Sequence, residues 1–266
     1  MKTIFLMELK LTQKMLLVWL VLVVLLTGFA AIEFIVLKDA MAQLAELTGS
    51  FPKLALVLFG LNGVDLRTSM GLYQCMVFWT NLLAYFFAGF LGVYAIAREE
   101  KFGTSEFLFS KPYKRSRVVW AKIGAAAVNL ALFAVVVGIA LYVCIILPVG
   151  DGRIVGTHII TTLGMLITQI TLFAIGLFIS SVTKDYKAAS LLTMLVIVVF
   201  YGIHFALDYA GTMQYLAFLT PIRYFEVIGV TRGGLNLWYV LLSIAIVSVC
   251  CFAASGRYTR KDLRAQ

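Results

Sequence analysis

The chain has 266 residues, of which 62% are hydrophobic and 13% charged, and its formal net charge is +9. A soluble domain carries about 25% charged and about 45–50% apolar residues, so the composition excludes a soluble globular protein and indicates a multi-pass protein of the lipid bilayer. In a soluble protein the basic excess would suggest nucleic-acid binding. Here the basic residues lie between apolar stretches, so we expect them to set membrane topology and predict no nucleic-acid partner.

The first 14 residues alternate apolar and charged positions. On a helix, Ile4, Met7 and Leu11 would fall on one side. Glu8 would point away from them. This pattern predicts an interfacial helix over residues 1–14 that leads into the first span. A cytoplasmic extension of that span fits the pattern equally well.

Six apolar stretches are long enough to cross a bilayer core about 30 Å thick as helices. Their length and their content of Leu, Ala and Met exclude strands, and helices satisfy their own backbone hydrogen bonds in lipid. The first stretch is too long for a signal peptide, so we interpret it as a retained span. We predict an all-α integral membrane protein, a single domain over residues 1–266, with transmembrane helices at 15–37, 71–97, 119–148, 156–183, 187–208 and 234–256.

Two connections carry signals for short amphipathic helices. In the first, Asp39 can cap a short helix, and Pro52 opens a second one that Gly60 ends. In the last, Pro221 opens a further short helix, and Gly234 closes it before the sixth span. We interpret these helices as covers over the outer end of the bundle.

Lys and Arg residues are distributed unequally among the connections. The segments outside the spans alternate between the two sides of the membrane. Of the 22 Lys and Arg residues, 16 lie in the segments of one side and 6 in those of the other. Because loops rich in Lys and Arg stay in the cytoplasm, both termini are predicted to be cytoplasmic. The richer set comprises residues 1–14, 98–122, 184–187 and 257–266, so its largest member connects spans two and three.

Residues 98–113, REEKFGTSEFLFSKPY, combine acidic and aromatic side chains in this connection. Exposed aromatic side chains rimmed by charge are typical of protein interfaces. The acidic side chains would be repelled by the negative cytoplasmic leaflet, which disfavours a helix lying on the membrane. We predict that this segment docks a partner protein through Glu99, Glu100, Phe102, Gly103, Thr104, Glu106, Phe107, Ser110 and Pro112.

The same connection resembles the intracellular loop of permease subunits of ATP-binding-cassette (ABC) exporters of the type-2 class. The shared pattern is an acidic pair, Gly-Thr, Glu, Leu, Ser and x-Pro before a basic cluster; the pair Lys101-Phe102 departs from it. Residues 46–72 and 219–225 are similar to outer loops of one bacterial branch, so the resemblance covers essentially the whole chain.

This resemblance implies that residues 98–113 form a short cytoplasmic coupling helix on a separately encoded ATP-binding subunit. Two copies of that subunit, holding ATP and Mg, would pair with two permeases, the second being another copy of this chain or a sister permease. Transport would be export across the cell membrane of a bacterium. The chain has no Gly-Lys dipeptide and so no phosphate-binding loop. We therefore predict a transport subunit without catalytic residues or a cofactor of its own.

Uncharged polar residues inside the spans are candidates for the substrate path. Asn81 and Gln169 lie near mid-membrane, and hydrogen bonds between helices are the alternative role for both. In the resembled family spans two and five tend to line the path, which adds Tyr85, Tyr201 and His204. Their aromatic neighbours would suit an apolar or amphipathic substrate.

Two other classes of protein stay open as alternatives. An ion-coupled six-span transporter commonly places ionisable residues near mid-membrane, but only His158 and His204 fall in the uncharged runs. An intramembrane enzyme needs a nucleophile with a base, and Ser180 and Ser181 have no His or Asp in helical register. The spacing of the four cysteines and two histidines predicts no metal site.

Overall fold

The computed structural model describes residues 2–37, 41–102, 115–183, 185–212 and 214–260. These residues form helices joined by short turns, and no strand occurs among them. Six helices are long and apolar enough to cross a membrane, so the predicted all-α, six-span fold is confirmed. The long helices are α1 (Lys2–Leu37), α4 (Ser69–Phe102), α6 (Arg115–Leu141), α8 (Arg153–Val182), α9 (Tyr186–Ala210) and α12 (Leu237–Arg260).

Two short elements continue α6 and complete the third span. The π-helix η2 (Tyr142–Ile146) and the helix α7 (Leu147–Val149) extend it to residue 149. Gly150 follows with φ of 72°, a left-handed conformation that glycine adopts without steric cost. The chain therefore turns at Gly150 and enters the fourth span at Arg153.

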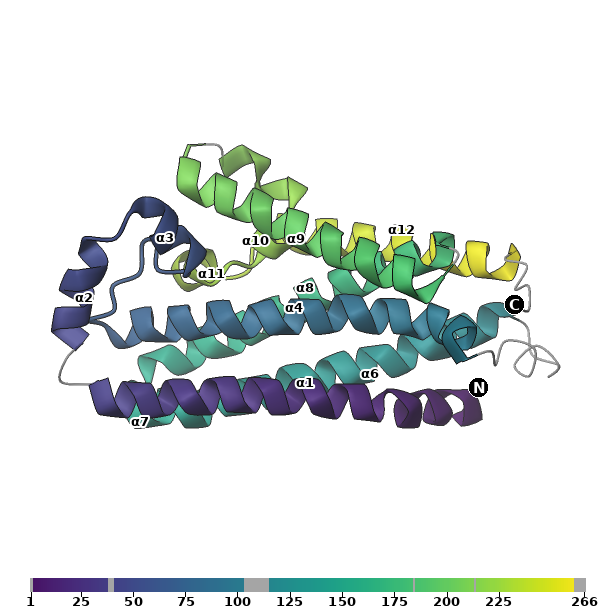
Figure 1. The fold of residues 1–266 in the computed structure, drawn as a ribbon, viewed down its shortest axis with the longest axis horizontal. Coiled ribbons are helices and arrows are strands. Elements are labelled where there is room, and N and C mark those ends of the chain that lie inside the picture. Colours follow the sequence, from purple (N-terminus) through teal and green to yellow (C-terminus); the bar gives the residue numbers. More distant parts are fainter. Residues whose placement is uncertain (1, 38–40, 103–114, 184, 213, 261–266) are drawn as a thin grey trace.

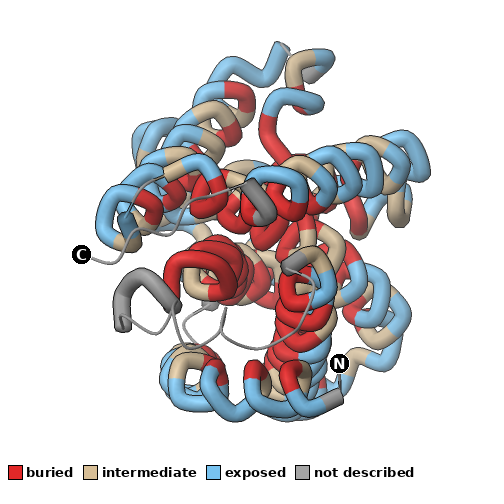
Figure 2. Tube along the Cα trace, turned by 90° about the vertical axis from the view of Figure 1, so that its right-hand side faces the viewer, coloured by how far each residue is buried: buried red, intermediate tan, exposed pale blue. Residues whose placement is uncertain are grey.

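The long helices run roughly along one axis, with α4 and α8 in the middle (Figure 1). These two helices pack most extensively against each other, while α1 packs on α6 and α12 packs on α8. Buried residues concentrate on the inner sides of the helices, and many outward side chains of α1, α9 and α12 are exposed and apolar (Figure 2). Such outer surfaces suit contact with lipid tails, which are as apolar as leucine.

Both termini lie at one end of the bundle, called here the terminal end (Figure 1). Which membrane face this end occupies stays a prediction from the charge distribution. The opposite, distal end carries the predicted short helices, although the last connection forms three of them rather than one. They are α2 (Met41–Gly49), α3 (Lys53–Leu58), the 3-10 helix η3 (Gln214–Leu219), α10 (Pro221–Tyr224) and α11 (Val227–Gly233).

Glycines allow α4 and α8 to approach each other closely. A Cβ atom added to Gly92 would overlap the backbone of α8 at Phe173, and one added to Gly176 would overlap the backbone of Gly89. Small residues at helix contacts let backbones pack tightly in membrane proteins, where van der Waals contact is a main source of helix association. This crossing therefore establishes α4 and α8 as the central pair.

The N-terminal segment does not form a separate interfacial helix. Helix α1 runs without a break from Lys2 to Leu37, so residues 2–14 extend the first span. The predicted apolar side is also wrong, because Met7 and Leu11 are exposed whereas Glu8 is only 3% exposed. Glu8 can point into the bundle because cations on two other helices compensate its charge there.

Candidate functional site

Most of the predicted coupling segment lies outside the described residues. Residues 103–114 are not described, and six of the predicted docking residues fall among them: Gly103, Thr104, Glu106, Phe107, Ser110 and Pro112. The backbone of Glu99, Glu100 and Phe102 belongs to the last turns of α4. Helix α4 thus connects the distal end of the bundle to the first residues of this segment.

A buried ion pair joins α1 and α4 at the terminal end. Arg98 Nη1 and Nη2 donate to the two carboxylate oxygens of Glu8, each at 2.8 Å. On α6, Lys122 Nζ lies 3.8 Å from the same carboxylate and donates to Ala95 O at 2.7 Å. These three charged side chains therefore hold three helices together at the start of the predicted coupling segment.

A second polar cluster gives His158 a structural role. The hydroxyl of Tyr73 lies 3.0 Å from His158 Nδ1, and His158 Nε2 lies 3.1 Å from Gly138 O. One neutral tautomer satisfies both contacts, with Nδ1 accepting from Tyr73 and Nε2–H donating to the carbonyl. Gly138 is four residues before the π-helix η2, so this bond secures α8 to the third span.

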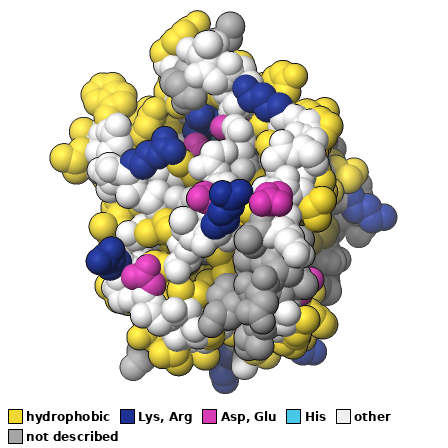
Figure 3. All heavy atoms as spheres, turned by 90° about the vertical axis from the view of Figure 1, so that its left-hand side faces the viewer, with side chains coloured by type: hydrophobic (Ala, Val, Ile, Leu, Met, Phe, Trp, Pro, Cys, Tyr) yellow, Lys and Arg dark blue, Asp and Glu magenta, His cyan; other side chains and the backbone are white. Residues whose placement is uncertain are grey.

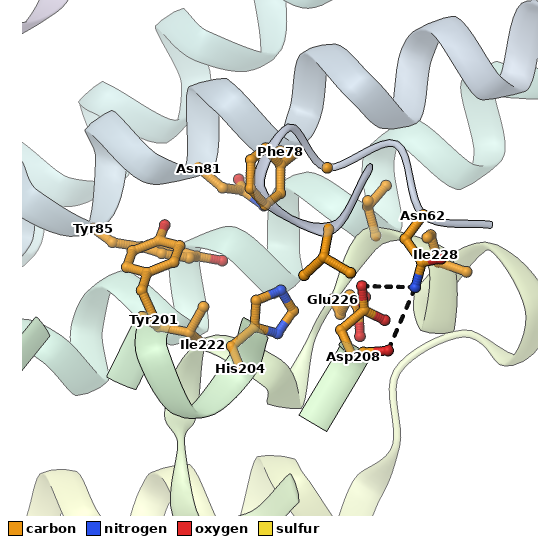
Figure 4. A pocket seen from close by; sticks show the side chains of 13 residues that line it. Asn62, Phe78, Asn81, Tyr85, Tyr201, His204, Asp208, Ile222, Glu226 and Ile228 are labelled. Carbon is orange, nitrogen blue, oxygen red and sulfur yellow. Dashed lines mark hydrogen bonds between the residues drawn. The ribbon is translucent and has the colours of Figure 1, made fainter. Parts of the chain in front are cut away.

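A cavity of about 40 Å³ lies near the distal end between α4, α9 and the short helices (Figure 4). Its walls come from α3 and the turn after it, from α4, from α9, and from the segment containing α10 and α11. The apolar part of the wall includes Phe78 and three aliphatic side chains after residue 221. The polar and tyrosine side chains of the wall are Asn62, Asn81, Tyr85, Tyr201, His204, Asp208 and Glu226.

Local sequence explains why the distal segments fold back over α4 and α9. Gly60 ends α3 with φ of 69°, and the ring of Phe78 occupies the space that a side chain at this position would need. Pro221 opens α10 at a position where its missing N–H costs nothing. The preceding Thr220 donates through its hydroxyl to Phe200 O at 3.1 Å, which anchors this segment to α9.

The structure brings together four of the five predicted path residues. Asn81 and Tyr85 of α4 face Tyr201 and His204 of α9 around the cavity (Figure 4). Gln169 lies elsewhere, fully buried on α8, and its Nε2 donates to Ala84 O of α4 at 3.4 Å. Gln169 therefore makes a hydrogen bond between helices, which is the alternative role stated for it in place of a position on the substrate path. A role for the four others in transport stays a prediction.

Aromatic rings pack around the inner part of the cavity. The ring of Tyr201 stacks on Phe86 at 6.4 Å and lies 6.4 Å from the ring of Tyr85. Phe205, one turn further along α9, lies 5.8 Å from Tyr201 and 6.3 Å from Phe78. These contacts hold α9 against α4 and make one part of the wall aromatic.

Two carboxylates of the cavity were not predicted from the sequence. Asn62 Nδ2 donates to Asp208 Oδ2 at 3.0 Å, and this bond secures the turn after α3 to α9. Arg223 Nη1 lies 3.8 Å from Glu226 Oε2. Burial raises the pKa of Glu226 above its ordinary value, and Arg223 offsets part of that effect. Asp208 follows His204 by four residues, so the two share one face of a helix, and this spacing could have predicted Asp208 as a cavity residue. No pattern in the sequence places Glu226 near the cavity.

The distal face has a mixed charge pattern. Lys and Arg side chains lie next to Asp and Glu side chains over much of it, with apolar side chains between them (Figure 3). At its edge, Lys53 Nζ lies 5.3 Å from the centre of the Tyr209 ring, a cation–π contact between α3 and α9. Helix α3 and the turn after it are therefore held to α9 through Lys53 and Asn62, in addition to the Thr220 contact of the later segment.

Six apolar spans, a glycine-packed central pair and a polar cavity between helices define a multi-pass integral membrane protein. The sequence profile of the family described as "ABC-2 family transporter protein" matches residues 7–263. The chain belongs to this family and is a membrane subunit of an ABC transporter. A comparison with individual curated proteins finds no match.

Proposed function

We propose that this subunit forms the substrate path of an ABC exporter and is driven by separately encoded ATP-binding subunits. Two such subunits, holding ATP and Mg, pair with two permeases, the second being another copy of this chain or a sister permease. The terminal end, with residues 98–113, faces the cytoplasm of a bacterial cell. The observation that carries the proposal is the family match over residues 7–263. The excess of Lys and Arg in the terminal-end connections supports the orientation.

Helix α4 supports a mechanical link between the two sites of this proposal. It carries Asn81 and Tyr85 at the cavity and continues unbroken to Phe102, within the predicted coupling segment of residues 98–113. At 1.5 Å per residue, about 26 Å of helix separates Tyr85 from Phe102. Because α4 also packs through Gly92 on α8 and through Arg98 on α1, a force on its terminal end acts on the central helices together.

Co-purification with a separately encoded ATP-binding subunit of the same organism tests the proposal. The wild-type chain is expected to retain that subunit and to be required for stimulated ATP hydrolysis in proteoliposomes. Glu106→Ala should reduce retention at least tenfold, because it removes an acidic contact from the docking segment. Glu46→Gln is the matched control, since Glu46 is exposed on α2 at the distal end. Failure of the wild-type chain to retain the subunit would refute the proposal.

An ion-coupled transporter is the second candidate, and the cavity supplies the observation in its favour. His204, Asp208 and Glu226 all line it, so ionisable groups are available on the proposed path. Transport by the chain alone, driven by a proton or sodium gradient and unaffected by ATP, would support this candidate against the first one.

A further inference from the structure

Two buried polar atoms of the cavity wall lack hydrogen-bond partners. Among the described residues, neither Asn81 Oδ1 nor the hydroxyl of Tyr201 has one. The two residues are only 8% and 6% exposed, and both line the cavity. Burying a polar atom without a hydrogen-bond partner destabilises a fold, so both atoms favour a ligand that pairs with them. A carbonyl oxygen can only accept, so Asn81 calls for a ligand that carries an N–H or O–H donor.

The charge around the cavity favours a cationic donor. The guanidinium group of Arg223 lies 3.8 Å from Glu226 Oε2, and Arg232 also acts on this carboxylate, so the attraction for a cation comes mainly from Asp208. His204 adds no positive charge, because its Nδ1 lies 3.5 Å from Arg223 Nη1 and accepts from it. Asp208 accepts from the neutral amide of Asn62, and this hydrogen bond does not compensate the charge of the carboxylate.

The remaining walls suit a cation that is attached to an apolar chain. Phe78, Tyr85 and Tyr201 present aromatic rings to the cavity, and ring faces attract ammonium groups. Ile222, Val227 and the other aliphatic side chains add an apolar part to the wall. About 40 Å³ holds roughly three water-sized groups. That space fits an ammonium group and its first carbons, whereas a drug-sized molecule occupies about 300 Å³ or more.

We propose that the cavity binds the protonated primary amine of an amphipathic substrate, with Asp208, Glu226 and Asn81 Oδ1 accepting from the ammonium group and the aromatic rings packing against it. This inference rests on the proposed function, because it assigns a substrate class to the path that the subunit forms. A quaternary ammonium group fits less well, since it has no N–H to donate to Asn81. A carboxylate fits least, since Asp208 and Glu226 would repel it.

A ligand titration of the purified chain in nanodiscs tests the proposal without any ATP-binding subunit. Saturation-transfer NMR would follow n-hexylammonium, with hexyltrimethylammonium, hexanol and hexanoate as matched probes. Hexylammonium is expected to bind at least about tenfold more tightly than hexanol, because hydrogen bonds between a cation and a carboxylate are stronger than those of a neutral hydroxyl. Equal binding of hexylammonium and hexanol, or tighter binding of hexanoate, would overturn the proposal.

Variants assign the binding to the cavity. Asp208→Asn and Glu226→Gln should each weaken hexylammonium binding at least about tenfold, as should Asn81→Leu. Gln169→Leu is the control for the amide, because Gln169 Oε1 also lacks a partner but lies outside the cavity. Glu33→Gln is the control for the carboxylates, since Glu33 is exposed. Full affinity in both carboxylate variants would refute the site.

The binding test and the test of the proposed function have different negative outcomes, so each proposal can be rejected without the other. Loss of amine selectivity, with the ATP-binding subunit still retained, would reject the substrate class alone. Selective amine binding by a chain that retains no ATP-binding subunit would reject the exporter and leave the amine site standing.

Discussion

The buried contact between Glu8 and Arg98 leads to an asymmetric prediction for neutral substitutions. Glu8→Gln removes a buried carboxylate that faces two cations, because Arg98 binds it at 2.8 Å and Lys122 lies 3.8 Å away. Removing one partner of a buried ion pair costs about 3–5 kcal/mol, since the other charge stays buried and uncompensated. We therefore expect Glu8→Gln to lower the free energy of unfolding by about 3–5 kcal/mol.

Arg98→Gln should cost less than Glu8→Gln. After this change Glu8 still faces Lys122, and two unit charges about 4 Å apart attract by about 4 kcal/mol at an effective dielectric constant near 20, before desolvation. The loss is then closer to that of one charged hydrogen-bonding group, about 1.5–3 kcal/mol. The double variant should be no less stable than Glu8→Gln alone, because it also removes one of the two buried cations that lose the Glu8 carboxylate.

SDS-driven unfolding in mixed micelles, followed by far-UV circular dichroism, measures these differences. Glu46→Gln serves as the control, because Glu46 is exposed on α2 and its change should stay within about 0.5 kcal/mol of wild type. If Glu8→Gln matched that control, the carboxylate would be hydrated rather than buried. If Arg98→Gln were the more damaging change, Lys122 would not be compensating Glu8.

Three further predictions concern packing, hydrogen bonding and protonation. Gly92→Ala should destabilise the bundle by about 1–3 kcal/mol in the same unfolding assay, because its Cβ overlaps α8, whereas Gly202→Ala, with open space around it, should not. His158→Phe should cost about 1–3 kcal/mol through loss of the bonds to Tyr73 and Gly138, and an unchanged unfolding free energy would exclude its structural role. The raised pKa of Glu226 means that the folded state releases this proton at higher pH than the unfolded state, so stability is lost as pH rises above about 4.3. Glu226→Gln should remove that loss, and parallel pH profiles of the two proteins would contradict the assignment.

The positions of the spans and of several turns could be predicted because they depend on short-range properties. Apolar length determines which segments cross a bilayer, and each predicted span overlaps one long helix. Pro52 and Gly60 flank α3 as expected, and Gly234 follows α11 with φ of 73°. These residues restrict or permit backbone angles wherever they occur, so their effect does not need a tertiary context.

The candidate site was only partly predictable. Asn81 and His204 are polar residues within apolar runs, and polar residues inside spans are rare and often functional, so the sequence predicts them as candidates. Asp208 and Glu226 lie at or beyond the end of span five, where charged residues are expected in water, so nothing marked them as cavity residues. Glu226 reaches the cavity because α10 folds back against α9 and α11 packs on α8 and α4, which depends on contacts such as Thr220 with Phe200.

The sequence by itself determined that the chain crosses a membrane six times and carries its basic residues in alternate connections, because hydropathy and charge are summed along the chain. Only the tertiary structure decided which polar residues lie inside. Glu8 is buried because Arg98, 90 residues away in sequence, meets it across a helix contact, and that pairing lowers the cost of burying either charge. The cavity likewise exists only where α4, α9 and the short helices meet, since no single helix supplies more than part of its wall.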